Sequence, residues 1–249
     1  RAMGAAVSIA SVVGSDTWGT DLRSLLEEAG VDVTGLVTDE ARPTVRKSRL
    51  MSGAQQILRV DWEESAAVEG EVAAAIQAHA ATLIEGVDVV ILSDYGKGTL
   101  TEETCAHVLD LAKERGLPVV VDPKGEDYSK YRGATLVSPN RNEAELALGH
   151  ALPDDDALSQ GARVLSEENG IEAIVITLGA GGIHYRDADG CEERVATKAR
   201  AVYDVTGAGD TVVAQLALHL GAGAALGDAV QLANEAAGIV VGRLGAATI

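Results

Sequence analysis

The sequence is short of cysteine, of cations and of long apolar runs, and each shortage argues against a class of protein. Its two cysteines, Cys105 and Cys191, lie far apart and in no metal-like spacing, which is typical of a protein of the reducing cytoplasm. Its formal net charge of −18 argues against a general nucleic-acid-binding protein, which needs a basic face. Apolar runs such as VDVVILS have the length of a strand and cannot cross a bilayer, so no membrane partner is expected.

Several catalytic motifs are also absent. The sequence contains no Walker Gly-Lys-Ser/Thr motif, no G-x-G-x-x-G at the first strand and no H-E-x-x-H. The five histidines are scattered, and each is more typical of a surface or core position than of a metal ligand. The first residues lack a cleavage pattern, so no signal peptide is expected. These absences leave the function to the glycine-rich and polar stretches.

Apolar runs alternate with helical patterns along most of the chain. A hydrophobic content of 47% suffices for one sizeable core, so residues 1–249 are expected to form one domain. The alternation predicts an α/β fold with a mainly parallel sheet covered by helices on both faces. Strands are expected within 5–14, 87–95, 117–124, 134–140 and 171–179, and helices within 16–30, 69–86, 101–116, 141–149, 157–170, 210–223 and 226–245.

Residues 33–62 break this rhythm, because they show strand-like alternation and no helical period. Within them PTVRKSRLM and QQILRVD flank SGA, which predicts a β-hairpin. The segment carries Arg46, Lys47, Arg49 and Arg59 in an otherwise acidic chain. These cations either protect an edge strand from unwanted pairing or form a basic flap over an anionic substrate.

Polar residues follow directly after the predicted strands. In sheets of this class, ligands bind at the carboxyl ends of the strands, so these residues indicate a site along one edge. The alternative is that they are turn residues, because every strand must end in something polar. The residues are Asp94, Lys97, Asp122, Lys124, Asn140, Glu143, Thr177 and Asp204.

The stretch DVTGAGD, Asp204 to Asp210, precedes an apolar helical pattern. Gly207 and Gly209 can form a turn, and Asp210 can cap the helix. The other interpretation is chemical, because a helix start behind small residues exposes N–H groups that bind phosphate. From this stretch alone the two interpretations are evenly balanced.

Taken together, DVTGAGD, ITLGAGGI, SPNRNEAE and QLANEAAG resemble the ribokinase-like sugar kinases, the PfkB family. The longer stretches ILSDYGKGTLT, VDPKGEDYSKYRGATLVSPNRNEAE and ANEAAGIVVGRLGAATI resemble its heptose 7-phosphate kinase branch. The resemblance implies a ribokinase-like three-layer αβα sandwich with a small β lid at about 33–62. It also implies ATP-dependent phosphorylation of D-glycero-β-D-manno-heptose 7-phosphate at O1, in ADP-heptose biosynthesis. The alternatives are another sugar or sugar-phosphate kinase, or a non-catalytic nucleotide or sugar binder.

The resemblance assigns roles to individual residues. Asp210 becomes the general base, and the turn of Gly207, Ala208 and Gly209 donates N–H groups to the charge that develops during transfer. Glu143 is implied to hold Mg²⁺ through water. The nucleotide positions are Lys124, Asn140, Arg141, Asn142, Glu143, Thr177, Gly179 and Asn234, and the substrate positions are Lys47, Arg49, Arg59, Asp94 and Lys97.

Three further expectations follow from the resemblance. Asp204 and Thr206 match a monovalent-cation site, which suggests K⁺. The partners are ATP and a phosphosugar, and relatives dimerise through the lid, so a homodimer is plausible. The family's first strand, with an early Gly-Asp and a later Gly-Gly that contact the sugar, should precede Arg1, so the kinase domain is expected to be incomplete at its N-terminus.

Overall fold

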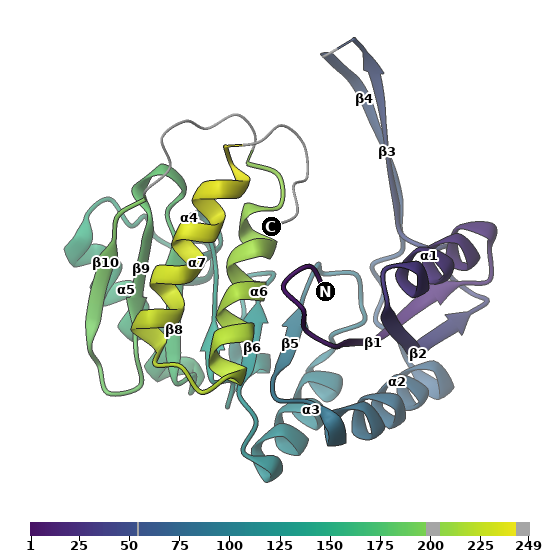
Figure 1. Cartoon of the computed structure of the whole chain (residues 1–249), viewed down its shortest axis with the longest axis horizontal. Helices are drawn as coiled ribbons and strands as arrows, with labels where there is room; N and C mark the ends of the chain where they lie inside the picture. The colour runs from purple at the N-terminus through teal and green to yellow at the C-terminus, as the bar shows by residue number, and fades with distance from the viewer. Residues whose placement is uncertain (54, 198–204, 243–249) are drawn as a thin grey trace. The chain divides into compact units, whose positions relative to one another are not determined.

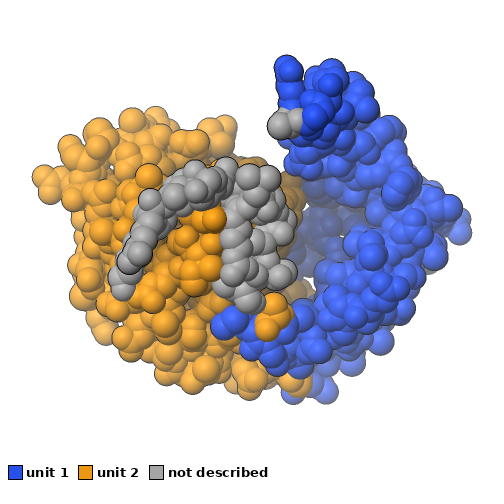
Figure 2. All heavy atoms as spheres, turned by 45° about the horizontal axis from the view of Figure 1, so that its top comes forward, with its two compact units in different colours: residues 1, 3–85, 96–104 blue, residues 2, 86–95, 105–249 orange. Residues whose placement is uncertain are grey.

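The computed structural model describes residues 1–53, 55–197 and 205–242 (Figure 1). The chain forms two compact units, which Figure 2 distinguishes by colour. Along the sequence the chain leaves the second unit directly after Tyr95. Unit 1 comprises residues 1, 3–85 and 96–104, and unit 2 comprises residues 2, 86–95 and 105–249.

Unit 1 contains a parallel pair of strands with two helices packed against it. The pair buries Val13, Val33 and Leu36. Asp16 starts the first helix, because its carboxylate accepts the N–H group of Gly19 at 2.8 Å. The second strand of the pair occupies the beginning of the expected lid segment. The elements are β1 (Val7–Gly14), α1 (Thr17–Glu28), β2 (Val31–Asp39) and α2 (Gly70–Leu83).

An antiparallel hairpin also belongs to unit 1 (Figure 1). Strand β3 (Arg46–Ser52) pairs with β4 (Gln55–Trp62), which confirms the hairpin predicted from the sequence. At its base the guanidinium of Arg46 lies against two tryptophan rings, 4.4 Å from the centroid of Trp18 and 3.7 Å from that of Trp62. This cation–π contact ties the hairpin to α1.

Unit 2 contains a six-stranded sheet with the order β10-β9-β8-β7-β6-β5. Strands β5 to β8 are parallel, and β9 and β10 add an antiparallel hairpin at one edge. The mainly parallel sheet predicted from the sequence is thus confirmed. The strands are β5 (Val90–Ser93), β6 (Val119–Asp122), β7 (Leu136–Val137), β8 (Ala173–Thr177), β9 (Ile183–Arg186) and β10 (Glu192–Val195).

Helices cover both faces of this sheet, as a three-layer sandwich requires. Side chains of α6 and α7 form one buried cluster with Ala173 and Val175 of β8, and Figure 1 shows these helices in front of the sheet. The alternate residues Ile174 and Ile176 are fully buried outside that cluster, and α4 and α5 pack on β8 as well. The helices are α3 (Glu102–Arg115), α4 (Arg141–Leu148), α5 (Asp155–Asn169), α6 (Ala208–Gly221) and α7 (Leu226–Val240). No helix in the described part of the chain is both long and apolar enough to span a membrane.

His184 of β9 is a buried histidine that affects stability. Its side chain is 3% exposed, and neither ring nitrogen has a hydrogen-bond partner among the described residues. Burial lowers its pKa, although the charges of Glu192 and Asp155 act in the opposite direction. The folded protein therefore excludes a proton that the unfolded chain binds as the pH falls through about 6.5.

We expect the free energy of unfolding to decrease below that pH, by at most about 1.4 kcal/mol per pH unit from this residue. The His184→Leu variant should lose less stability than the wild type between pH values of about 7.5 and 5.5. Urea unfolding at both pH values measures the difference. His150→Leu is the matched control, because His150 is exposed. An equal pH dependence in wild type and His184→Leu would contradict the expectation.

Candidate active site

Polar residues at the carboxyl ends of the parallel strands come together in unit 2. Asn140, beyond the end of β7, forms a parallel bridge with Thr177, the last residue of β8, and Thr177 donates its N–H to the carbonyl of Pro139 at 2.9 Å. One strand further, the carbonyl of Asp122 accepts the N–H of Asp94 at 2.9 Å. The strand ends therefore lie along one edge of the sheet, where ligands of this fold class bind.

Glu143 lies at this edge, in the first turn of α4, and both of its carboxylate oxygens are engaged. Oε2 accepts the N–H of Asn140 at 3.1 Å, and Asn140 Oδ1 accepts the N–H of Glu143 at 3.0 Å, which completes a capping box. Oε1 accepts a hydrogen bond from Lys124 Nζ at 2.9 Å. Arg141 and Asn142 lie between Asn140 and Glu143, in the first turn of α4. The Asn-x-x-Glu pattern therefore starts the helix and also places Lys124, Asn140 and Glu143 in one cluster.

Asp122 adds a second carboxylate to this cluster. Burial, together with the negative charges of Glu143 and Asp210, raises the pKa of Asp122 to about 6, while the charge of Lys124 acts in the opposite direction. The negative charges of Glu143 and Asp210 thus act on the half-buried carboxyl group of Asp122 at the strand ends. Carboxylate oxygens are the donors that a hard divalent cation prefers, but within the described part of the chain no three or more Asp, Glu, His or Cys side chains come together to hold a metal ion.

The carboxylate of Asp94 anchors the chain after β5. Asp94 is 5% exposed, and its Oδ2 accepts hydrogen bonds from Lys130 Nζ at 2.5 Å and from Tyr131 Oη at 2.7 Å. The hydroxyl of Tyr131 in turn accepts the N–H of Lys124 at 3.1 Å. Asp94 therefore has a structural role at the site, and its contact with a substrate stays a prediction.

Asp210 lies in the first turn of α6 but does not cap it. The N-cap is Gly207, in the left-handed conformation with φ 79°, and Asp210 is the third residue of the helix. The interpretation of Asp210 as the N-cap is therefore wrong. The N–H of Ala208 donates to the carbonyl of Val205 at 3.2 Å. One of the three N–H groups expected to bind the transferred phosphoryl group is therefore already used within the protein. The exposed carboxylate of Asp210 instead accepts a hydrogen bond from Tyr95 Oη at 2.9 Å.

The glycine-rich stretch after β8 contains two kinds of glycine. A side chain at Gly179, where φ is 57°, would meet no atom within 4 Å, so this backbone is open to a ligand. A Cβ at Gly182 would instead lie 2.0 Å from the carbonyl oxygen of Val195, so only glycine fits there. Asn234 of α7 is 4% exposed, and its Nδ2 donates to the carbonyl of Ala196 at 2.8 Å.

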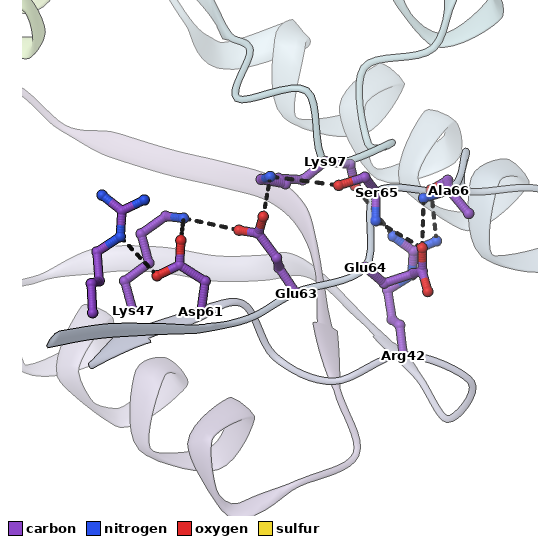
Figure 3. A network of polar contacts seen from close by, with 9 residues as sticks. Arg42, Lys47, Asp61, Glu63, Glu64, Ser65, Ala66 and Lys97 are labelled. Atoms are coloured by element: carbon purple, nitrogen blue, oxygen red, sulfur yellow. Dashed lines mark hydrogen bonds and ion pairs between the residues drawn. The ribbon is translucent and has the colours of Figure 1, made fainter. Parts of the chain in front are cut away.

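The cations of the hairpin form an ion network in unit 1 (Figure 3). Lys47 Nζ lies 3.0 Å from a carboxylate oxygen of Asp61 and 2.9 Å from one of Glu63. Lys97 Nζ contacts the other oxygen of Glu63 at 2.6 Å, and Arg59 Nε contacts Asp61 at 3.0 Å. The charges of Lys47 and Lys97 are therefore already balanced by carboxylates.

Arg49 differs from these cations. It lies directly opposite Arg59 in the β3–β4 register, and among the residues that the structure describes no carboxylate forms an ion pair with it. Like charges directly opposite in a sheet destabilise it. The pair of guanidinium groups is therefore a favourable place for an added anion.

The expected monovalent-cation site is only partly described by the structure. Asp204 lies outside the described residues, so its pairing with Thr206 as a cation site stays a prediction; Thr206 itself is exposed just before α6.

Tyr95, Lys130 and Tyr131 were not predicted from the sequence. No local pattern marks them, because their contacts join residues that are far apart in the chain.

The fold and this strand-end site define an α/β protein of the ribokinase-like class. Phosphofructokinase-2 of Escherichia coli, solved in complex with potassium, superposes with a TM-score of 0.79 at 20% identity, over 98% of this chain and 78% of that one. A ribokinase of Arabidopsis thaliana complexed with ribose and ATP gives a TM-score of 0.78 at 20% identity, over 97% and 77%. The chain belongs to the pfkB family of carbohydrate kinases, whose model matches residues 1–249. Members of this family are phosphotransferases that act on sugars.

Curated relatives are more similar to this chain in sequence than the two solved structures are. The bifunctional protein HldE of Wolinella succinogenes is 44% identical over 247 residues, which are 99% of this chain and 52% of that protein. HldE of Geobacter sulfurreducens is 44% identical over 252 residues, covering 100% of this chain and 51% of that protein. The chain thus spans about half the length of these relatives.

Proposed function

We propose that this chain uses ATP to phosphorylate D-glycero-β-D-manno-heptose 7-phosphate at O1, giving the 1,7-bisphosphate of ADP-heptose biosynthesis in the cytoplasm. The position of Asp210 carries the kinase part of the proposal. Its exposed carboxylate lies in the first turn of α6, where backbone N–H groups and the helix dipole favour a phosphoryl group. Support for the heptose comes from the 44% identity to proteins named HldE.

In the proposed reaction, Asp210 takes the proton of the sugar hydroxyl. That oxygen forms a bond to the γ-phosphorus of ATP as the bond from the γ-phosphorus to the β,γ-bridging oxygen breaks, and ADP leaves. Such a transfer needs positioning and charge stabilisation more than covalent catalysis. The N–H groups at the start of α6 are the proposed donors to the transferred group.

The nucleotide is proposed to bind along the strand ends of unit 2. Lys124, Asn140 and Glu143 form one cluster there, and the bridge from Asn140 to Thr177 connects this cluster to the end of β8. Gly179 follows β8 and offers backbone that no side chain covers. The carboxylate of Glu143 is of the kind that Mg²⁺ prefers, and the ion when bound would offset the charge of the phosphates. Glu143 is proposed to reach the ion through water. A K⁺ site that includes Thr206 is a further part of the proposal.

The hairpin of unit 1 is proposed to bind the phosphate that the sugar already carries. Arg49 and Arg59 lie opposite each other, and Arg49 has no ion pair within the described chain.

The other face of the hairpin carries exposed Leu50, Leu58 and Val60, which supports a homodimer between two copies of this hairpin. Analytical ultracentrifugation tests the dimer, and a monomer at every concentration would contradict it.

Release of ADP from Mg-ATP tests the proposed activity. We expect turnover with D-glycero-β-D-manno-heptose 7-phosphate and little with ribose, fructose 6-phosphate or no sugar. The assay should use this chain and a longer version of the protein, because the chain spans about half the length of its relatives. Turnover with another sugar would reject the heptose and keep the kinase. Absence of turnover in both versions, with ATP binding intact, would favour a non-catalytic binder.

A further inference from the structure

A side chain outside the predicted site touches the proposed base. Tyr95 Oη donates a hydrogen bond to Asp210 Oδ1 at 2.9 Å, from the end of β5 to the first turn of α6. The two residues are 115 positions apart in the sequence. The tyrosine is 58% exposed, so the contact lies at the surface where a substrate can enter. Both residues belong to unit 2.

The residue before Tyr95 explains why the ring reaches Asp210. Asp94 is held by Lys130 and Tyr131 through its carboxylate and by the carbonyl of Asp122 through its N–H. This anchor is buried and bonded on both its backbone and its side chain, so the chain leaves β5 in one direction. The hydrogen bond of Tyr95 is therefore set by the sheet rather than by a chance contact of a surface side chain.

A hydroxyl donor at one carboxylate oxygen has a defined effect on a general base. A carboxylate alone can rotate about its last bond, and a proton-accepting oxygen must be aligned with the hydroxyl that it serves. With Oδ1 held by Tyr95, the orientation of the group is fixed and Oδ2 is left for the substrate. Burial and the negative charge of Asp210 both raise the pKa of Tyr95, so the phenol stays protonated and remains a donor.

We propose that Tyr95 is a positioning residue for Asp210: its hydroxyl holds Oδ1, so that Oδ2 faces the sugar hydroxyl and accepts its proton. This inference rests on the proposed kinase function, because it gives Asp210 the role of base. Tyr95 itself takes no proton and touches no reacting atom. The competing account is that the phenol only occupies the place of the sugar hydroxyl until the sugar displaces it.

Steady-state kinetics of the Tyr95→Phe variant separates the two accounts. Loss of alignment should lower kcat on the order of tenfold, a part of the about 10²–10⁴-fold that a general base supplies. The KM values for sugar and ATP should stay within about twofold, because the ground-state contacts remain. Tyr128→Phe is the matched control: it removes a buried tyrosine hydroxyl that has no hydrogen-bond partner among the described residues. It should leave both constants unchanged.

A 3-fluorotyrosine at position 95 provides a second test, with one kinetic readout and one spectroscopic readout that needs no turnover. It keeps the hydroxyl and should retain most of the kcat that Tyr95→Phe loses. Its ¹⁹F resonance reports the ionisation of the phenol, and Asp210→Asn should move that ionisation to lower pH, because the charge that raises the pKa of Tyr95 is removed. The same ionisation in both proteins would show that the hydrogen bond is absent in solution, and would overturn the proposal.

The remaining outcomes are also decisive. An unchanged kcat in Tyr95→Phe, with Asp210→Asn inactive, would reject the positioning role and keep the base. A lower KM for the sugar with unchanged kcat would favour the place-holder account and overturn ours. If Asp210→Asn retained full activity, the assignment of the base would fail first, independently of Tyr95. The kinetics are run with whichever sugar the wild type phosphorylates, so an error in the heptose assignment does not affect them.

Discussion

Replacing Asp210 by asparagine is expected to lower kcat for sugar phosphorylation by about 10²–10⁴-fold, the contribution typical of a general base. The amide keeps the size of the side chain and can still accept a hydrogen bond from Tyr95, but it cannot take the proton of the sugar hydroxyl. Affinity for ATP should change little or rise slightly, because a negative charge beside the bound phosphates is removed. Steady-state kinetics and calorimetric titration with ATP measure the two quantities.

Asp228→Asn is a closely matched control. Asp228 is the third residue of α7 and follows a glycine, as Asp210 is the third residue of α6 and follows Gly209. Both substitutions remove an acid from a helix start, at a cost in stability of about 0.3–1 kcal/mol. Only the loss at Asp210 should affect kcat. Equal kinetic losses in the two variants would point to helix destabilisation, and full activity of Asp210→Asn would reject its role as the base.

The Asn140-x-x-Glu143 element illustrates what a sequence motif leaves open. The pattern of a capping residue followed three positions later by glutamate predicts a helix start on physical grounds alone, and the capping box is present. The ion pair of Glu143 with Lys124 could not be predicted, because the two residues follow different strands. The motif therefore has a local explanation, and the cluster around it is a product of the sheet.

The partner and direction of each strand are a second feature that the sequence pattern did not determine. Alternation within residues 33–62 predicted extended structure, and the hairpin formed where SGA separates two strands. The same alternation could not indicate that β2 pairs in parallel with β1, because alternation marks a half-buried strand and not its partner. In unit 2 the regular succession of strands and helices left one simple solution, a mainly parallel sheet, and strands β5 to β8 confirm it.

Tyr95 shows why part of the site was not predicted. Its neighbours in the sequence were recognised, since Asp94 and Lys97 follow a predicted strand, but an exposed tyrosine outside helices and strands carries no periodic signal. Its contact with Asp210 depends on the buried bonds of Asp94 to Lys130 and Tyr131. Side-chain contacts across such distances follow from tertiary packing, which a single sequence does not specify residue by residue.

The second large effect is expected at Arg49. The Arg49→Gln variant should raise the KM for a phosphorylated sugar by about 10- to 150-fold, which corresponds to the loss of a charged hydrogen bond of about 1.5–3 kcal/mol. The KM for ATP should not change. The reason is electrostatic. Arg49 faces Arg59 across the hairpin and, among the described residues, has no carboxylate to balance its charge. Its guanidinium group should therefore attract a phosphate more strongly than a cation that is already paired with a carboxylate.

Lys47→Gln provides the comparison on the same face of the hairpin. Lys47 is already paired with Asp61 and Glu63, so a phosphate must compete with two carboxylates for it, and its removal should cost less than that of Arg49. The difference should shrink as salt is added, because exposed charges are screened within about 10 Å at an ionic strength of about 0.1 M. If the two variants raised KM equally, net charge on the hairpin would matter rather than the arginine pair. If neither did, the sugar phosphate would bind elsewhere, and the exposed arginines would serve only to protect the edges of the hairpin.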